Sequence, residues 1–438
     1  MEMVARTAAV LQGLLTTVAE EVGRACRLIK RRREFTESSL VATFVLGFLR
    51  HPKATWDQLA LVASDLGANV TPQAPALRDT LQEVWLKAIG CVVQANERVQ
   101  PLLRRFSQVL IGDSTTIPLA DSLAGEFPGC GGSHGTSRAA AKWQVIWDCV
   151  SGALWKMSWE AGRHSDAKSE ILDETPPPGS LSIFDLGDFS LDRFRKWQEA
   201  GAHWISRGIS DITVTVEGVA HDLHDWLKAQ VGGPIDQWVE VGAARLRCRI
   251  VALRAPAEVA ARRRQKACDK AAKKGRQPTA RHLATCDWTV FLTSCPADLL
   301  TWKEVVVLYR VRWQIELLFK LCRVLSHGAH NLIETHRTED PVRQLVELYS
   351  RMTAVVIQHW LILITFWSDP LLSLTKAARL IRDELSQLIP IARQLPELIA
   401  LLTHWQTRFQ GRARLDKRKT KPSNPQLIAN PELLSFTY

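Results

Sequence analysis

The sequence lacks the features that mark membrane and secreted proteins. Its longest apolar run, 354–367, has only 14 residues and contains Gln358 and His359. A helix that spans a membrane needs about 20 apolar residues, so we expect a buried helix at this position. The N-terminus has no basic segment followed by a long apolar stretch, which argues against a secretion signal. We therefore expect a soluble chain in the cytoplasm.

Cysteine and histidine patterns that mark disulfide frameworks or zinc sites are also missing. The nine cysteines are odd in number and contain no C-x-x-C pair, so we expect reduced thiols. His221 and His224 come closest to a ligand pair, and two polar residues flanking a turn are the simpler interpretation. There is no internal repeat. With 46% hydrophobic and 23% charged residues among 438, the chain is typical of a folded globular protein.

Acidic residues are outnumbered by basic ones, and the excess is unevenly placed. The 56 Lys and Arg residues exceed the 45 Asp and Glu residues, which gives a net charge of +11. Many of the basic residues fall in three segments, 24–33, 262–281 and 408–421. Such blocks repel themselves unless a polyanion is near, which favours a nucleic-acid partner. The alternative for each segment is a solvated helix face or an unstructured tail.

Residues 1–95 are expected to form a helical N-terminal DNA-binding domain. Apolar residues recur there at helical spacing, and two helices around a turn at 67–69 would form a helix-turn-helix-like pair. Any helical bundle gives the same pattern, so the alternative is an all-helical domain without a recognition helix.

Short strands alternate with helices from about 106 to 207, which predicts a mixed sheet. Residues 208–300 are interpreted as a β-rich insertion that includes the basic segment 262–281. Beyond 301 the chain is expected to be helical, with helices at 302–325, 342–367, 371–388 and 394–408, and 331–438 is assigned to a helical C-terminal region with a loosely ordered basic tail.

Three carboxylates stand out by their position. Asp113 and Asp185 each end a short apolar strand, and Glu316 lies on the expected helix 302–325. On one continuous helix, a single face would carry Tyr309, Arg312, Glu316, Lys320 and Arg323. Carboxylates brought together in this way suit Mg²⁺ or Mn²⁺, and two such ions promote cleavage of a phosphodiester, while nearby cations hold phosphates. The alternatives are a turn or N-cap for each aspartate and a surface ion pair for the glutamate.

The spacing Tyr309-x2-Arg312-x3-Glu316-x6-Arg323 resembles the Y-R-E-K signature of DDE transposases in the insertion-sequence-four family, a bacterial cut-and-paste group. Asp113 in Ile-Gly-Asp-Ser-Thr-Thr and Asp185 in Ile-Phe-Asp-Leu-Gly-Asp-Phe-Ser are similar to the first two catalytic aspartates of that family. The resemblance covers about 106–323, and it is looser over the N-terminal helices and the C-terminal region.

The resemblance implies an α/β fold with an RNase H-like core and a mixed sheet, made of 96–207 and 301–330. It also implies a two-metal site for Mg²⁺, or Mn²⁺, held by Asp113, Asp185 and Glu316. Water would cut the element's end and release a 3′-hydroxyl, which then attacks the opposite strand or target DNA. The implied partners are double-stranded DNA with terminal inverted repeats and a second copy of the chain, in a homodimer on DNA at the nucleoid.

Further positions follow from the same resemblance. Tyr309, Arg312, Lys320 and Arg323 would position phosphates, and Arg207 would contact DNA near the active site. Trp288 matches a tryptophan on which a flipped-out base stacks, with a strand-core role as the alternative.

The chain departs from the family pattern at two places. Arg323 replaces the usual lysine, and Lys320 is one turn earlier and could supply the ammonium group. Asp188 replaces an aromatic residue, and we expect it to cap the helix that starts near Ser190, although it could instead perturb metal binding. Two other functions stay open: a different RNase H-like nuclease, and a non-catalytic DNA-binding protein derived from a transposase.

Overall fold

The computed structural model describes residues 2–29, 36–67, 74–93, 101–130, 138–209, 211–230, 232–273, 275–324, 340–367, 369, 371–416 and 422–434. Contacts divide the chain into two units. We call 1–99, 114–165 and 314–417 the helical unit, and 100–113, 166–313 and 418–438 the sheet unit. Ten strands form one mixed sheet in the order β3-β2-β1-β4-β5-β10-β9-β8-β6-β7. This arrangement confirms the expected α/β class with a mixed sheet.

Helices dominate the helical unit. They are α1 (Glu2–Gly13), α2 (Ala19–Ala25), α3 (Glu37–Arg50), α4 (Trp56–Asp65), α5 (Ala74–Gly90), α11 (Trp313–Val324, whose first residue belongs to the sheet unit), α12 (Pro341–Phe366), α13 (Leu374–Asp383), α14 (Leu385–Leu388) and α15 (Leu395–Arg408), with a π-helical turn at Leu14–Val18. The unit also holds the hairpin of β2 (Ala139–Asp148) and β3 (Leu154–Ala161). The helices of the N-terminal region and the hairpin confirm the expected secondary structure, whereas DNA binding by residues 1–95 stays a prediction and most of the turn expected at 67–69 lies outside the described residues.

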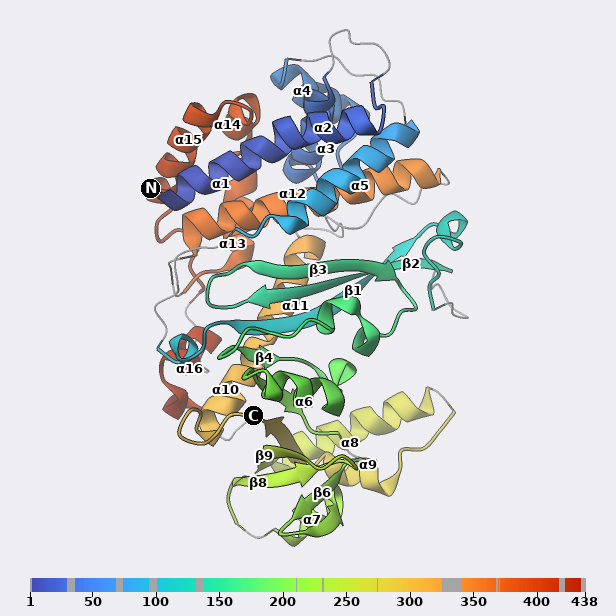
Figure 1. The fold of residues 1–438 in the computed structure, drawn as a ribbon, viewed down its shortest axis with the longest axis vertical. Coiled ribbons are helices and arrows are strands. Elements are labelled where there is room, and N and C mark those ends of the chain that lie inside the picture. Colours follow the sequence, from blue (N-terminus) through green and yellow to red (C-terminus); the bar gives the residue numbers. More distant parts are fainter. Residues whose placement is uncertain are drawn as a thin grey trace. The chain divides into compact units, whose positions relative to one another are not determined.

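The long helix α12 is the centre of the helical unit. It starts where Asp340 accepts hydrogen bonds from two backbone N–H groups of the first turn and Pro341 occupies an early helical position. Figure 1 shows α12 running alongside α5, and it also packs on α3, α13 and α15. Neighbours on several sides explain why its apolar run is buried, as expected. Within the described residues, no helix combines the length and apolar character that a membrane crossing requires.

The hairpin turn packs against α12. Gly152 has φ +74°, and a Cβ atom there would lie 2.4 Å from the Leu363 side chain, so only glycine fits. The carbonyl of Gly152 accepts a hydrogen bond from Nε2 of His359 at 2.6 Å. A buried histidine therefore ties the turn to the helix.

The sheet unit contains most of the strands. They are the first part of β1 (Val109–Leu119), β4 (Leu181–Ile183), β5 (His203–Arg207), β6 (Thr213–Val216), β7 (Val219–Asp222), β8 (Ile235–Val241), β9 (Leu246–Arg254) and β10 (Trp288–Thr293). Its helices are α6 (Leu191–Glu199), α7 (Leu223–Ala229), α8 (Ala257–Ala272), α9 (Ala280–Thr285), α10 (Trp302–Val311) and α16 (Asn424–Ala429), with short 3-10 turns that include Leu103–Arg105, Asp166–Lys168 and Leu186–Asp188.

The neighbouring strands β1, β4 and β5 are parallel, whereas β10 pairs with both β5 and β9 in the antiparallel sense. The strands β6 to β9, which follow β5 in the chain, therefore extend the same sheet beyond β10, and β10 is the strand that pairs with β5. Most of the basic segment 262–281 lies on helices α8 and α9, which stand at the edge of this stretch in Figure 1.

Three expectations about elements were wrong. The helix expected at 302–325 is two helices, because α10 ends at Val311 and α11 begins at Trp313. Asp113 does not end a strand, since β1 continues to Leu119. The tail is not wholly loose, because α16 packs on α10. The expected domain boundaries stay a prediction.

Candidate active site

Parallel pairing places two aspartates at the same level of the sheet. The last matched residues of β1 and β4 are Ile111 and Ile183, and Asp113 and Asp185 each follow their strand's matched residue by two. Neighbouring parallel strands run in the same direction, so both side chains come to the carboxyl end of β4, where α/β sheets commonly bind ligands.

A glycine makes room for this arrangement. A Cβ atom on Gly112 would lie 2.0 Å from the ring of Phe184, the residue before Asp185. The Phe184 ring is buried and packs on Trp197, with ring centroids 5.5 Å apart. The side chain at position 112 must therefore be absent for the backbone that carries Asp185 to pack beside Asp113.

Helix α10 brings a phenol and a guanidinium to the aspartates. Tyr309 Oη donates a hydrogen bond to Asp185 Oδ1 at 3.0 Å. Arg312 directly follows α10; its Nη1 donates to Asp113 Oδ2 at 3.2 Å, and its Nη2 lies 3.5 Å from Asp185 Oδ2. One buried guanidinium thus bridges both carboxylates, and these four residues form the centre of the candidate site.

The phenol of Tyr309 is held in its protonated form. Burial raises its pKa, and the Asp185 carboxylate raises it further, while Arg312 and Arg207 oppose the rise. The ring is 7% exposed and packs on Phe291 at 5.0 Å between centroids. Tyr309 is therefore a hydrogen-bond donor at neutral pH, and it fixes the orientation of Asp185.

A fourth strand-end residue, Arg207, shares this level of the sheet. Ile205 on β5 is matched with Ile183 on β4, so Arg207 also lies two residues beyond the matched pair. Its guanidinium lies over the Phe291 ring at 5.9 Å, and its buried Nε has no hydrogen-bond partner among the described residues. Its position fits the expected contact with a phosphate.

Asp188 does not cap the following helix, so that expectation was wrong. Ser190 is the N-cap of α6, and its hydroxyl accepts a hydrogen bond from the Arg193 backbone N–H. Asp188 is instead buried, and its pKa is raised to about 7 by burial and then by the carboxylates of Asp166, Asp113 and Asp185, against the opposing charge of Arg193. Three aspartates thus act electrostatically on Asp188.

Sequence reasoning missed Asp166. It belongs to a short 3-10 turn, and its Oδ2 lies 3.7 Å from the place of a Cβ atom on Gly187. No strand or motif precedes it, so only the three-dimensional arrangement relates it to Asp188.

The remaining predicted residues belong to other elements. Glu316 is half-buried in the first turn of α11, within the helical unit, and its part in the site stays a prediction. Lys320 and Arg323 also lie on α11, with side chains outside the described residues. Arg312 separates α10 from α11, and the single face expected for Tyr309 to Arg323 stays a prediction.

Trp288 is the first residue of β10 and is 6% exposed. The Arg254 guanidinium lies over its ring, 4.8 Å from the centroid. This burial favours the alternative of a strand-core residue, and base stacking on Trp288 stays a prediction.

The donor chemistry of the centre fits a divalent ion in part. Two carboxylates already converge on one cation, Arg312, and carboxylate oxygens are the ligands that Mg²⁺ and Mn²⁺ prefer. Among the described residues, no three His, Cys, Asp or Glu side chains lie close enough together to hold a metal ion. Asp113 and Asp185 could therefore provide two ligands, and a complete ion site needs a further donor.

Comparison with known proteins adds independent information. Residues 104–339 match the family described as transposase DDE domain. The chain is 26% identical to the transposase for insertion sequence element IS231F of Bacillus thuringiensis subsp. israelensis, over 92% of this chain and 90% of that protein. It is 24% identical to the IS231B transposase of B. thuringiensis subsp. berliner (78% and 77%) and 21% identical to the IS1151 transposase of Clostridium perfringens (63% and 62%).

Proposed function

Because the chain belongs to the family of transposase DDE domains, we propose that it cuts DNA at the ends of an insertion sequence and joins those ends to target DNA. Water first attacks a phosphodiester at the element's end and releases a 3′-hydroxyl, which then attacks the opposite strand or the target. The observation that carries this proposal is the convergence of Asp113 and Asp185 on Arg312 and Tyr309.

Asp113, Asp185 and Glu316 would hold two Mg²⁺ ions, or Mn²⁺. When bound, such ions supply Lewis-acid activation of the attacking oxygen and stabilise the leaving oxygen. The two aspartates fit this role because they are hard donors already gathered around one positive charge.

The cationic and phenolic groups would position the substrate. Arg312 neutralises the two carboxylates before DNA arrives, and its planar guanidinium also suits a phosphate. Tyr309 keeps Asp185 oriented through its hydrogen bond. Arg207 would contact a phosphate at the same level of the sheet, and Lys320 and Arg323 would add positive charge from α11.

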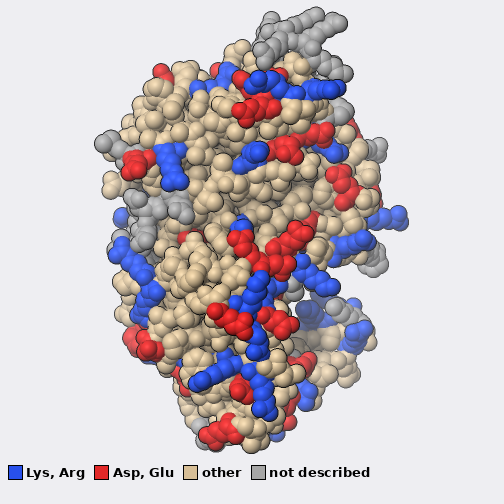
Figure 2. Space-filling view, viewed as in Figure 1, with Lys and Arg blue, Asp and Glu red and all other residues tan. Residues whose placement is uncertain are grey.

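Contact with DNA beyond the centre is supported by α8. Arg262, Lys266 and Lys270 are exposed and four residues apart, so they share one face of that helix. Figure 2 shows that elsewhere on the visible face Lys and Arg are interspersed with Asp and Glu. A local basic face suits a phosphate backbone. We place the terminal inverted repeats on such surfaces, with two copies of the chain acting as a homodimer on DNA.

The test is strand cleavage of DNA that carries the terminal repeats of the element, with Mg²⁺. We expect wild type to cut and Asp113→Asn and Asp185→Asn to lose at least about 10³-fold in rate, because each removes a charged ligand. Asp192→Asn is the matched control, since Asp192 is exposed on α6 of the same unit. It should cut like wild type.

Two results would contradict the proposal. Binding of the repeats without cleavage by wild type would indicate a non-catalytic DNA-binding protein. Cleavage of branched DNA that has no terminal repeats would indicate a different nuclease of the same fold.

A further inference from the structure

Helix α10 starts with a strong local signal. Thr301 is its N-cap, and its hydroxyl accepts a hydrogen bond from the Glu304 backbone N–H, while Glu304 Oε2 accepts one from the Thr301 N–H at 2.8 Å. Such a capping box defines where a helix begins. It does not fix where that beginning lies in the protein.

Arg105, which lies four residues before β1, holds this helix start from one side. Its Nη1 donates to the Leu299 carbonyl at 2.8 Å and to Glu304 Oε2 at 3.0 Å, and its Nη2 donates to Glu304 Oε1 at 2.9 Å. Burial raises the pKa of Glu304, but the bonds from Arg105 and Thr301 outweigh it and lower the pKa below its usual value. Glu304 is therefore ionised at neutral pH, and the pair is a charge-assisted, two-pronged contact.

Arg249 on β9 holds it from the other side. Its Nη1 donates to the Leu300 carbonyl at 2.6 Å and to the Cys295 carbonyl at 3.1 Å. Its Nη2 and Nε both bond to Asp236 on β8, with Nη2 at 2.8 Å from Oδ2. Arg249 is 1% exposed, so this is a buried guanidinium that makes four hydrogen bonds.

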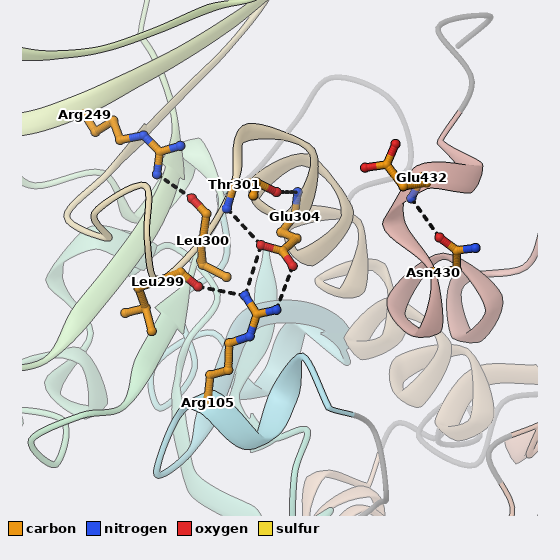
Figure 3. Close-up of polar contacts among 8 residues, drawn as sticks. All are labelled: Arg105, Arg249, Leu299, Leu300, Thr301, Glu304, Asn430 and Glu432. Atoms are coloured by element: carbon orange, nitrogen blue, oxygen red, sulfur yellow. Dashed lines mark hydrogen bonds and ion pairs between the residues drawn. The ribbon is translucent and has the colours of Figure 1, made fainter.

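The two arginines donate hydrogen bonds to the carbonyl groups of two consecutive residues, Leu299 and Leu300. Figure 3 shows Arg105 and Arg249 reaching Leu299 and Leu300 from different elements, directly before Thr301. Tyr309 and Arg312 follow Thr301 by 8 and 11 residues, roughly 12 and 16 Å along a helix that rises 1.5 Å per residue. If the start of a rigid helix moves, its far end moves with it. A functional site needs its side chains placed within about 0.5 Å of the productive geometry, so a shift at Thr301 would disturb Tyr309 and Arg312.

We infer that Arg105 and Arg249 are positioning residues that hold α10 so that Tyr309 and Arg312 reach Asp185 and Asp113. The inference rests on the proposed function for its effect on cleavage, but its structural content does not. It also gives the β-rich stretch a defined role, because Arg249 and Asp236 make β8 and β9 part of the framework of the site.

The first experiment measures cleavage and DNA binding separately. Arg249→Lys keeps the charge, but an ammonium has three N–H donors where the guanidinium uses four, and it lacks the planar fork that makes the two bonds to Asp236. We expect single-turnover cleavage to fall about 10- to 100-fold, while the Kd for DNA changes less than about twofold. Glu304→Gln keeps the capping box and weakens only the Arg105 contact, so we expect a smaller loss. Arg247→Lys, the same change at an exposed position of β9, should have no effect.

A double-mutant cycle distinguishes positioning from general destabilisation. If Arg249 acts through Tyr309 and Arg312, the loss caused by Arg249→Lys should become smaller in a Tyr309→Phe background or in an Arg312→Met background. A loss equal to that in wild type in both backgrounds, at a temperature where circular dichroism shows every variant folded, would overturn the inference.

A spectroscopic readout does not depend on cleavage. The chain has three tyrosines, so 3-fluorotyrosine labelling gives three ¹⁹F resonances, and Tyr309→Phe assigns one of them. We expect Arg249→Lys to shift the Tyr309 resonance and to leave that of Tyr349, in the helical unit, unchanged. An unmoved Tyr309 resonance would refute the positioning role. Absent cleavage by wild type, with the shift present, would refute only the proposed function.

Discussion

The helical unit and the sheet unit each bury a titratable group, and the two groups respond to pH in opposite ways. In the helical unit, burial lowers the pKa of His359 to about 4, despite its bond to the Gly152 carbonyl. In the sheet unit, burial and neighbouring carboxylates raise the pKa of Asp188 to about 7. His359 is therefore neutral at pH 7, whereas Asp188 has a pKa close to neutral pH and lies among like charges.

This difference in pKa reflects different surroundings of the two buried groups. His359 serves packing, because its Nε2–H bonds to Gly152 and its buried Nδ1 has no partner among the described residues, so the ring favours the neutral state. In the sheet unit, several aspartates lie near one another, and their mutual repulsion is unfavourable for stability. Such a group of carboxylates is typical of a site that binds cations.

The largest expected effect concerns Asp188→Asn. The folded pKa lies above the unfolded value of 3.8, so Asp188 costs no stability below pH 4, and its cost grows as pH rises to about 7. The difference between the pKa of 3.8 and the folded pKa of about 7 corresponds to about 4 kcal/mol. Urea denaturation with a chelator should show the variant more stable than wild type by up to that amount at pH 8, and equal near pH 4.

Asp192→Asn, on the exposed face of α6, provides the control and should show no pH-dependent difference. A constant difference between Asp188→Asn and wild type from pH 4 to pH 8 would contradict the electrostatic explanation.

A somewhat smaller effect of opposite sign is expected for His359. Its folded pKa lies below the unfolded value of 6.5, so its contribution to stability is present above pH 6.5 and is lost as pH falls to about 4. The loss amounts to about 3 kcal/mol. His359→Gln should be less stable than wild type at pH 7 but lose less stability on acidification, in contrast to His404→Gln at an exposed position. Parallel pH profiles for His359→Gln and wild type would rule this out.

The smallest effect tests whether Arg312 competes with metal ions for the carboxylates. In Arg312→Met, Asp113 and Asp185 lose the cation that bridges them. We expect calorimetric titration to show Mg²⁺ binding about tenfold more tightly than to wild type, equivalent to about 1.4 kcal/mol. Asp113→Asn in the same background should abolish the gain. Unchanged affinity would mean that the guanidinium and the ion occupy different places.

Local patterns made much of this architecture predictable. Alternation of short apolar runs gave the strands that carry Asp113 and Asp185, and the Tyr309–Arg312 spacing pointed to the residues that contact them. Each of these signals lies within a few neighbouring residues. The family resemblance added Arg207, whose place in the sheet is set by the register of β4 and β5.

What the sequence did not reveal depends on contacts between distant residues. Arg105 and Arg249 are ordinary basic residues in sequence, and only the fold brings both to the start of α10. Asp188 was predicted to be the N-cap of α6 because Asp is common at N-caps and lies close to the helix start. The N-cap is instead Ser190, two residues later. No glycine or proline lies near the break after Val311, so the sequence did not indicate that the helix would end there.

The pairing of β5 directly with β10 affects how much change this part of the fold can accept. Residues added to or removed from the hairpin of β6 and β7 need not move β5 or β10, because these two strands pair with each other. Changes in β8 and β9 have a wider effect, because Asp236 and Arg249 also hold the start of α10.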